Sequence, residues 1–262
     1  MAKRLRMLMR MGHLTRTGQV GDGREEALVR HVLAHATPGD LDDTIRVIDA
    51  YAYQQATLIN VGDEKGLLLD AAVRRAQPRL LLELGTYCGY SALRMARVMH
   101  PGARLCSIEF SEANASVARR IWDHAGVGER VTVVHGTLGD EGGRTIDRLT
   151  TRHGFGPGQV DFVFVDHVRD AYLPDLRRIL EQRWLHPGSI VLADNMKVPG
   201  APLYREYLRD REGTEWRTQE HHTHVEYQTW VKDLVLESEY LASPGEAAAD
   251  TAAANGGGPA PG

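Results

Sequence analysis

The sequence predicts an α/β protein with a Rossmann-like, doubly wound, seven-stranded sheet that is mostly parallel. An antiparallel closing strand and an N-terminal helical cap complete the predicted fold. Two observations predict this class. Short apolar runs alternate with amphipathic stretches between residues 80 and 193, which is typical of a parallel sheet covered on both faces. The 262 residues include 42% hydrophobic residues and two cysteines, so a single large core can form without disulfides.

Hydrophobic periodicity places the individual elements. Helices are expected over 24–36, 40–59 and 63–76, then near 90–99, 112–125, 138–151 and 172–184. The last helix before the sheet should direct inward Leu67, Leu68, Ala71, Ala72 and Ala76. Strands are expected at Leu80–Leu84, Leu105–Ile108, Val131–Val134, Val160–Val165 and Ile190–Ala193, with closing strands at 215–220 and 231–238. Pro187-Gly188 should form a turn before the fifth strand. The four tryptophans are expected to pack in the interior: Trp122, Trp184, Trp216 and Trp230.

The two ends of the chain differ in composition from the middle. Residues 1–23 are expected to be a basic N-terminal extension, whose apolar residues are interrupted by Arg6 and Arg10 and therefore do not resemble a secretory signal. A transit peptide or a membrane-surface helix is the alternative for this segment. The main folded domain is predicted over 24–241, and 242–262 is rich in Ala, Gly and Pro and is expected to be a disordered tail.

Charge and hydropathy narrow the class of partners. The net charge is −4 and the pI is about 6.3, which disfavours nucleic acid as a partner. The longest apolar runs fall well short of the roughly 20 residues of a membrane helix, so no transmembrane segment is expected. We therefore expect a cytoplasmic protein, monomeric or homodimeric, that acts on a small molecule.

Polar residues follow the strands at their carboxyl ends, where such sheets bind ligands. The first strand leads into Glu83-x-Gly85-x-x-x-Gly89, which lacks the middle glycine of the dinucleotide fingerprint. Glycines there let the backbone approach a ligand, and the spacing suits a nucleoside without a pyrophosphate. Glu109 ends the second strand, where an acid commonly binds ribose hydroxyls. The alternative is an ordinary Gly-rich turn.

A metal site is predicted at the next two strand ends. Asp166 follows the fourth strand, and Asp194 and Asn195 follow the fifth. If these strands are neighbours, three oxygen ligands converge, which is the ligand type that Mg²⁺ prefers. The alternative is that the same residues cap helices and turns.

Several motifs together resemble the catechol O-methyltransferase family of class I S-adenosylmethionine-dependent O-methyltransferases, in a bacterial-type soluble form. They are Asn60–Asp63, Leu82–Ser91, Asp166-His167, Tyr172–Pro174, Leu192–Asn195, Pro199–Pro202 and Glu226-Tyr227. The resemblance implies Mg²⁺-dependent methylation of a vicinal dihydroxy-aromatic molecule. It implies cofactor contacts at Val61, Glu83, Gly85, Tyr87, Ser91, Glu109, Thr137, Asp166 and His167. It also implies metal ligands at Asp166, Asp194 and Asn195, and a substrate-hydroxyl acceptor at Glu226.

The chain departs from the family pattern at three positions. Where familiar members carry a catalytic lysine, this chain has Arg169, which stays protonated and cannot act as a base. We expect Arg169 to stabilise a phenolate, with Lys197 as another candidate base. Thr57 and Val168 replace two aromatic wall residues, so a wider ring slot is expected. Two further hypotheses stay open at this point, a non-catalytic S-adenosylmethionine-binding protein and a nicotinamide-dependent oxidoreductase.

Overall fold

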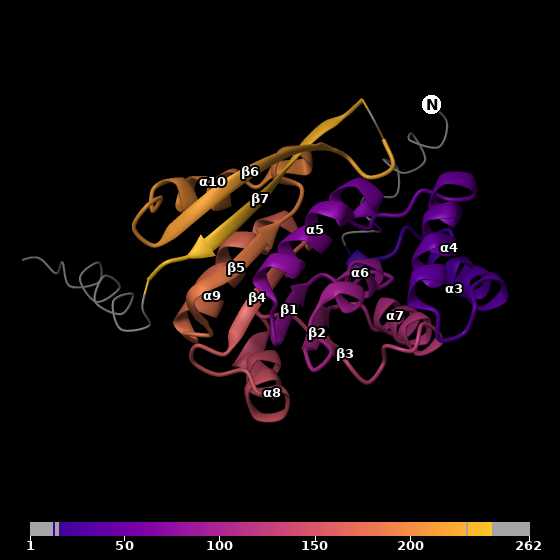
Figure 1. The fold of residues 1–262 in the computed structure, drawn as a ribbon, viewed down its shortest axis with the longest axis horizontal. Coiled ribbons are helices and arrows are strands. Elements are labelled where there is room, and N and C mark those ends of the chain that lie inside the picture. The colour runs from indigo at the N-terminus through magenta and orange to yellow at the C-terminus, as the bar shows by residue number, and fades with distance from the viewer. Residues whose placement is uncertain (1–12, 14–15, 229, 243–262) are drawn as a thin grey trace, which may run out of the picture.

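The computed structural model describes residue 13, residues 16–228 and residues 230–242. One seven-stranded sheet runs through the molecule in the order β3-β2-β1-β4-β5-β7-β6 (Figure 1). Strands β1 to β5 are parallel, and β7 is antiparallel to both of its neighbours. The predicted fold class is confirmed, including the antiparallel closing strand. The strand order reverses between β1 and β4, which creates the switch point where such sheets bind ligands.

The elements follow one another as the alternation of patterns predicts. The strands are β1 Leu80–Leu84, β2 Arg104–Glu109, β3 Val131–His135, β4 Val160–Val165, β5 Leu185–Ala193, β6 Trp216–His224 and β7 Lys232–Tyr240. The helices are α3 Arg24–His35, α4 Leu41–Gln54, α5 Gly62–Ala76, α6 Tyr90–Val98, α7 Glu112–His124, α8 Arg144–His153, α9 Tyr172–Glu181 and α10 Pro202–Arg209. Short helical turns lie at η1 Glu141–Gly143, η2 Arg169–Ala171 and η3 Met196–Gly200.

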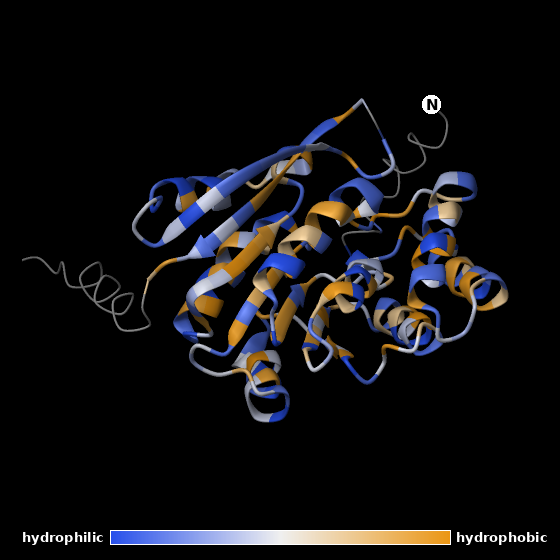
Figure 2. Cartoon of the chain, viewed as in Figure 1, coloured by the Kyte–Doolittle hydropathy of each residue, from blue (hydrophilic) through white to orange (hydrophobic). Residues whose placement is uncertain are grey.

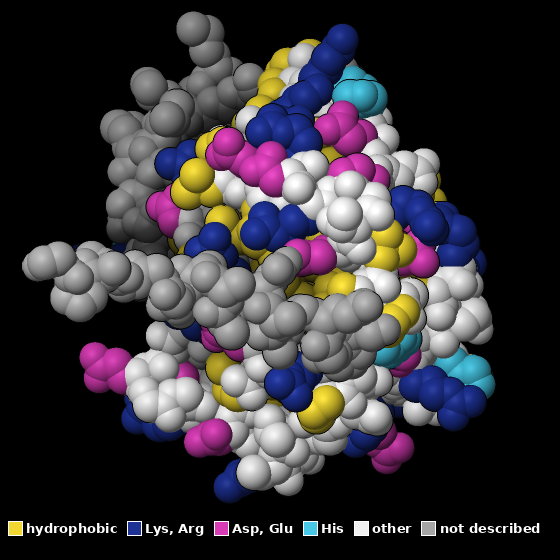
Figure 3. Space-filling model, turned by 90° about the vertical axis from the view of Figure 1, so that its left-hand side faces the viewer, with side chains coloured by type: hydrophobic (Ala, Val, Ile, Leu, Met, Phe, Trp, Pro, Cys, Tyr) yellow, Lys and Arg dark blue, Asp and Glu magenta, His cyan; other side chains and the backbone are white. Residues whose placement is uncertain are grey.

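Two hydrophobic cores lie on the two faces of the sheet. Alternate strand residues supply each core, because successive side chains of a strand point to opposite faces. Leu81 and Phe162 join the core under α3 to α7, whereas Leu82 and Val163 join the core under α8, α9 and α10. Figure 2 shows hydrophobic residues gathered in the central strands and a largely hydrophilic β6 at the sheet edge. Figure 3 shows acidic and basic side chains interspersed over one face of the molecule.

Several sequence-based expectations are wrong in detail. Pro187-Gly188 lies within β5, because the register between β4 and β5 shifts over this stretch instead of a turn preceding the strand. The expected helix over 40–59 ends at Gln54. The expected helix over 138–151 is divided into η1 and α8, with Gly142 in a non-helical conformation.

The inward face of α5 also differs from the prediction. Leu67 is 64% exposed, and the buried stripe includes Lys65, Leu69 and Val73. The helical spacing of the aliphatic residues predicts an entirely apolar inward face, but the face of α5 that packs on the sheet includes Lys65. This difference determines the electrostatics of the candidate site.

The described segment before α3 packs on the domain. Val20 is buried, and the Gly18 carbonyl accepts a hydrogen bond from Asn114 Nδ2 of α7 at 2.9 Å. The remainder of the N-terminal extension, 1–12 and 14–15, and residues 243–262 of the expected tail lie outside the described residues. Among the helices that the structure describes, none combines the length and apolar character needed to span a membrane.

Candidate functional site

The site lies at the carboxyl ends of the central strands. Sheet hydrogen bonds continue just past those ends, from Gly85 N to Ile108 O at 3.1 Å, from Asp166 N to Leu84 O at 2.9 Å, and from Asp194 N to Val165 O at 3.0 Å. These bonds place the residues that follow β1, β4 and β5 side by side. The neighbouring relationship of the fourth and fifth strands, on which the predicted metal set depends, is confirmed by their parallel pairing.

The glycines of the turn after β1 are required by contacts within the protein. Gly85 has φ 99°, and a Cβ there would lie 2.2 Å from the Asp166 carbonyl oxygen. Gly89 has φ 80°, and a Cβ would lie 2.4 Å from Trp122 Nε1. Both positions therefore exclude a side chain because of contacts within the protein, whereas the sequence pattern predicts that the approach of a ligand requires these glycines.

Glu83 is a buried carboxylate held by two hydroxyls. Its oxygens accept short hydrogen bonds from Ser91 and Ser107, and the residue is 0% exposed. Burial raises the pKa of Glu83 to about 7, and the two serine hydrogen bonds oppose that rise. A cationic ligand beside this carboxylate would stabilise its charged form.

Glu109 is held by backbone amides at the end of β2. Its carboxylate accepts hydrogen bonds from Tyr87 N at 2.8 Å and from Ser111 N at 2.9 Å. Burial raises the pKa of Glu109, while the amide donors lower it. The Tyr87 hydroxyl donates to Glu25 Oε1 of α3 at 3.1 Å. The helical cap and the turn after β1 are therefore linked directly at this point.

His167 carries a buried polar atom without a partner. Its Nε2 lies 2.9 Å from Asp175 Oδ2, and its ring stacks on Tyr172 with centroids 5.0 Å apart. Within the described protein, buried Nδ1 has no hydrogen-bond partner. Such an atom is typical of a position that a ligand or water completes.

Three acids surround the ammonium of Lys65 at the base of the site. Lys65 Nζ lies 2.7 Å from Asp194 Oδ1, 2.7 Å from Glu226 Oε1 and 2.8 Å from Asp233 Oδ2. The three carboxylates have oxygens within 4.8 Å of one another. Burial alone would lower the pKa of Lys65, but the three carboxylates outweigh burial and raise it. The ammonium therefore stays charged.

The predicted metal ligands Asp166, Asp194 and Asn195 lie next to the Lys65 cluster and share Asp194 with it. Asp194 Oδ1 accepts from Lys65 and from Asn195 N, whereas Oδ2 is buried without a hydrogen-bond partner in the described protein. Asn195 Nδ2 donates to Glu226 and Asp233, so its amide oxygen points away from those acids. Burial and the nearby charges of Asp194 and Glu226 raise the pKa of Asp166. An unpartnered carboxylate oxygen, an outward amide oxygen and a second, partly buried acid fit a hard cation.

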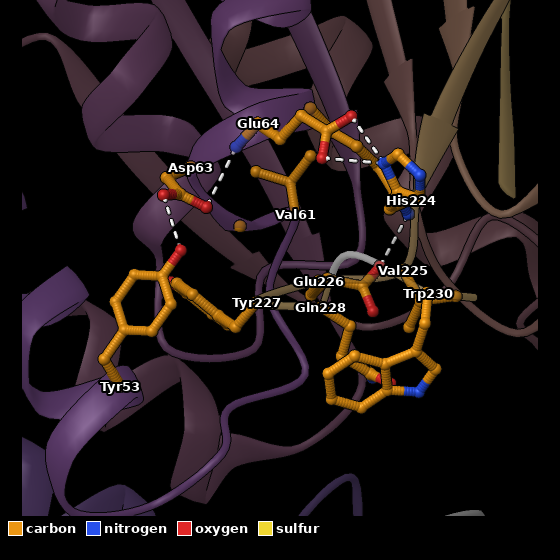
Figure 4. Close-up of a pocket in the computed structure, with 12 residues that line it drawn as sticks. Tyr53, Val61, Asp63, Glu64, His224, Val225, Glu226, Tyr227, Gln228 and Trp230 are labelled. Atoms are coloured by element: carbon orange, nitrogen blue, oxygen red, sulfur yellow. Dashed lines mark hydrogen bonds and ion pairs between the residues drawn. The ribbon is translucent and has the colours of Figure 1, made fainter. Parts of the chain in front are cut away.

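A pocket of about 280 Å³ opens beside Glu226 (Figure 4). Val61 at the start of α5 lines it, together with Tyr53, Tyr227 and Trp230. The Tyr53 and Tyr227 rings meet edge to face with centroids 5.1 Å apart. Trp230 was expected to pack in the interior, and that expectation is wrong because its side chain is 67% exposed at the pocket rim. The pocket therefore has aromatic surfaces that do not come from positions 57 and 168.

Three predicted site residues lie at the periphery. Thr137, after β3, is exposed. Arg169 in η2 is exposed, and its Nε lies 3.4 Å from Asp170 Oδ1. Lys197 in η3 is exposed, and its backbone N–H donates to Asp233 Oδ1 at 3.0 Å. The structure therefore places the acids and Asn195 in contact with one another, whereas Arg169 and Lys197 lie exposed at the edge of the site.

Sequence reasoning missed Lys65, Asp233 and Trp230. A signal for Lys65 existed, because positions 65, 69, 72 and 73 form one helical stripe. Asp233 immediately precedes the apolar run Leu234–Leu236 of β7. No local signal distinguished Trp230 from a core tryptophan.

The sheet topology and the site define a Rossmann-like methyltransferase fold. Among solved structures, an O-methyltransferase of Streptomyces achromogenes bound to S-adenosylmethionine matches with a TM-score of 0.60 and 25% identity, over 74% of this chain and 88% of that chain. A Bacillus cereus O-methyltransferase has a TM-score of 0.59 at 23% identity, over 82% of this chain and 97% of that one, and supports the fold alone.

The sequence comparisons identify the family. Residues 42–211 match the O-methyltransferase family model. A probable O-methyltransferase of Mycobacterium tuberculosis is 65% identical over 229 residues, covering 87% of this chain and 97% of that protein. Bovine catechol O-methyltransferase is 42% identical over 190 residues, covering 72% of this chain and 68% of that protein. The chain belongs to the O-methyltransferase family and is an S-adenosylmethionine-dependent O-methyltransferase, which excludes the oxidoreductase alternative.

Proposed function

We propose that this enzyme transfers a methyl group from S-adenosylmethionine to one hydroxyl of a vicinal dihydroxy-aromatic molecule, in a Mg²⁺-dependent reaction. The observation that carries the proposal is the arrangement around Asp194. An unpartnered buried carboxylate oxygen faces one side, and a charged acceptor, Glu226, lies next to Asn195 at 3.0 Å. The site therefore offers a position for a cation that would bind one hydroxyl and, next to it, an acceptor for a second hydroxyl. A molecule with two adjacent hydroxyls would use both. The similarity to bovine catechol O-methyltransferase supports the same substrate class.

The cofactor contacts are proposed from the strand ends. Glu83 and Tyr87 would face the cationic part of the donor, because a carboxylate and an aromatic face both stabilise a sulfonium. Glu109, held by two amides, would accept hydrogen bonds from ribose hydroxyls. His167 offers its unpartnered Nδ1. The remaining proposed contacts are Val61, Gly85, Ser91, Thr137 and Asp166.

Asp166, Asp194 and Asn195 would hold the metal ion. When bound there, Mg²⁺ lowers the pKa of a coordinated hydroxyl. Glu226 accepts a hydrogen bond from the other hydroxyl of the diol and thereby decides which oxygen faces the methyl group. In the methyl transfer, the methyl–sulfur bond breaks as the methyl–oxygen bond forms. The product of the donor leaves as a neutral thioether, and the hydroxyl proton is released.

Two exposed basic residues, Arg169 and Lys197, are the candidates for a role in handling that proton. Arg169 cannot accept the proton because its guanidinium stays charged, so we assign it the stabilisation of a phenolate that has already lost its proton. Lys197 is the candidate proton acceptor, and it can take up the proton only in its uncharged amine form. The aromatic ring of the substrate would lie against Tyr227 and Trp230, which line the pocket beside Glu226.

A methyl-transfer assay tests the proposal. The purified chain is incubated with S-adenosylmethionine and a panel of catechols, with matched monohydroxy analogues as the control. Each reaction is run with Mg²⁺, with a chelator, and with Mg²⁺ added back. We expect turnover of the catechols that the chelator abolishes and Mg²⁺ restores. Turnover that persists in the chelator, or equal turnover of the monohydroxy analogues, contradicts the proposal. Cofactor binding without any turnover would show that the acceptor is not a catechol of this panel, and would contradict the proposed substrate class.

A further inference from the structure

Lys65 is a cation at the base of an active site for which neither the sequence patterns nor the comparisons suggest a role. It is 1% exposed, which is rare for a lysine unless its charge is paired. Its Nζ has three carboxylate partners at 2.7 to 2.8 Å, one for each of the three N–H donors of an ammonium. The lysine is therefore fully paired and fixed in position.

The three partners of Lys65 come from separate parts of the chain. Lys65 belongs to α5, Asp194 follows β5, Glu226 lies in the turn after β6, and Asp233 lies in β7. Within the described residues these three acids are the group with the ligand count and spacing of a metal site. The ammonium already lies among them, in contact with all three.

The ammonium and the proposed metal use different oxygens of Asp194. Oδ1 is bound by Lys65, whereas Oδ2 is buried and has no hydrogen-bond partner in the described protein. Asn195 divides the space in the same way, because its Nδ2 donates to Glu226 and Asp233 on the lysine side and its amide oxygen points the other way. The boundary between the two cation positions therefore runs through Asp194 and Asn195.

Counting charges shows why a fixed cation is needed. Asp166, Asp194, Glu226 and Asp233 gather four carboxyl groups at one end of the sheet, and Lys65 is the lysine that contacts three of them. Without the ammonium, a divalent ion could neutralise the three lysine-bound acids as well as it neutralises the Asp166 side. Lys65 and Asn195 both bind Glu226 through Oε1. A divalent ion bound there could also take the second oxygen, Oε2, which must stay available to accept a hydrogen bond from the substrate.

We propose that Lys65 is a positioning residue that permanently fills the cation position among Asp194, Glu226 and Asp233. It thereby confines the divalent metal ion to the Asp166 side and keeps the second oxygen of Glu226, Oε2, available for the substrate. This inference rests on the proposed function for the roles of the metal and Glu226. The new element is that one of the two cations of the active site is a side chain of the protein, the Lys65 ammonium, and the other is the bound metal ion.

Mn²⁺ binding tests the inference without measuring activity. The full-length chain is titrated with Mn²⁺ alone and followed by electron paramagnetic resonance, which counts bound ions and reports pairs of nearby ions by their spin coupling. We expect one ion per native chain. We expect Lys65→Met, which keeps length and removes charge, to bind a second ion with a spin-coupled signal, and Lys65→Met/Asp233→Asn to return to one ion. A single uncoupled ion in Lys65→Met, with unchanged affinity, overturns the inference.

A second comparison covers the case in which Lys65→Met does not fold. In the otherwise native chain, Asp233→Asn should change the Mn²⁺ dissociation constant less than threefold, because Lys65 keeps the ion away from that acid. Asp166→Asn should raise the constant at least tenfold. Equal losses in the two variants overturn the inference. A native chain that binds no Mn²⁺ overturns the proposed metal role. In that case Lys65→Met tests the role of Lys65 separately. An ion newly bound by the variant supports the inference, and no bound ion overturns the inference as well.

Discussion

Asn195 Nδ2 lies 3.0 Å from Glu226 Oε1, which joins the segment after β5 to the turn between β6 and β7. The contact links a proposed metal ligand to the proposed acceptor of the substrate's second hydroxyl. Asn195 adopts φ 59°, a left-handed conformation in which asparagine is one of the more common non-glycine residues. This backbone conformation holds the Asn195 amide between the proposed metal site and Glu226. A change in Glu226 should therefore affect which hydroxyl is methylated.

Glu226→Gln should lower kcat/KM about a hundredfold and reduce the preference for one hydroxyl. The substitution keeps the size of the side chain but removes a charged acceptor, and hydrogen bonds to charged groups contribute about 1.5–3 kcal/mol. The ratio of the two monomethylated products, separated chromatographically, measures the effect. As a matched control, Glu220→Gln changes an exposed acid of β6 in the same way. An unchanged product ratio with Glu226→Gln would remove Glu226 from orienting the substrate.

Much of the fold could be predicted because the relevant signals are local. The five parallel strands are apolar runs that need only their own residues to be recognised, and the acids at their ends follow from strand position. The Lys65 cluster could not be predicted in this way. Its members are separated by up to 168 positions, and the pairing of β7 with β5, which brings Asp233 to the site, is a tertiary property. The exposed position of Trp230 has the same cause, since nothing in the residues near it in the sequence distinguishes it from a core tryptophan.

Asp166→Asn should weaken Mg²⁺ binding and remove most of the activity. The substitution removes one charged ligand, and loss of a charged oxygen ligand weakens Mg²⁺ binding strongly. We expect kcat at standard Mg²⁺ to fall at least a hundredfold and the Mg²⁺ concentration for half-maximal rate to rise at least tenfold. A Mg²⁺ titration of initial rates measures both quantities. Full activity with an unaltered Mg²⁺ titration would contradict the assignment of Asp166 as a ligand.

Arg169→Ala should lower kcat about tenfold without shifting the pH profile, because the guanidinium stabilises charge but does not titrate in the working range. Arg169→Lys should recover part of the loss. Lys197→Met should have the smaller effect on kcat, since it acts only as the alternative base. The pH dependence of kcat for the three variants is the measurement. If Lys197→Met removes an ionisation from the profile and Arg169→Ala leaves kcat unchanged, the two assignments must be exchanged.

Trp230→Ala should raise KM for the aromatic substrate about tenfold and change kcat less than threefold. The indole lies at the pocket rim and is 67% exposed, so its removal costs binding area but leaves the carboxylates in place. Contact with an aromatic side chain contributes about 1 kcal/mol beyond the buried area. Leu203→Ala is the control, because Leu203 is an equally exposed hydrophobic residue (68%) on α10. Equal effects of the two substitutions would show that Trp230 does not contact the substrate.

Glu83 should make cofactor affinity rise with pH. Burial raises its pKa to about 7 in the free protein, so the carboxyl is mostly protonated near pH 6 and mostly ionised near pH 8. A cationic donor binds the ionised form, and one such group lowers the dissociation constant about tenfold across this range. Calorimetry at the two pH values measures it. Glu83→Gln should show a smaller rise in affinity over this pH range, and an identical dependence in both proteins would exclude Glu83.

The same carboxyl should make the stability of the cofactor-free protein change with pH in the opposite direction. The pKa of Glu83 is higher in the folded chain than the ordinary value of 4.5, so the folded state binds more protons than the unfolded state between these pKa values. Its contribution to stability is therefore fully present below pH 4.5 and is lost as the pH rises to about 7. Denaturant unfolding at pH 5 and pH 7.5 should show that Glu83→Gln gains stability relative to the native chain at the higher pH. A stability difference between the two proteins that does not change with pH would show that Glu83 ionises normally, and the predicted pH dependence of cofactor affinity would fail with it.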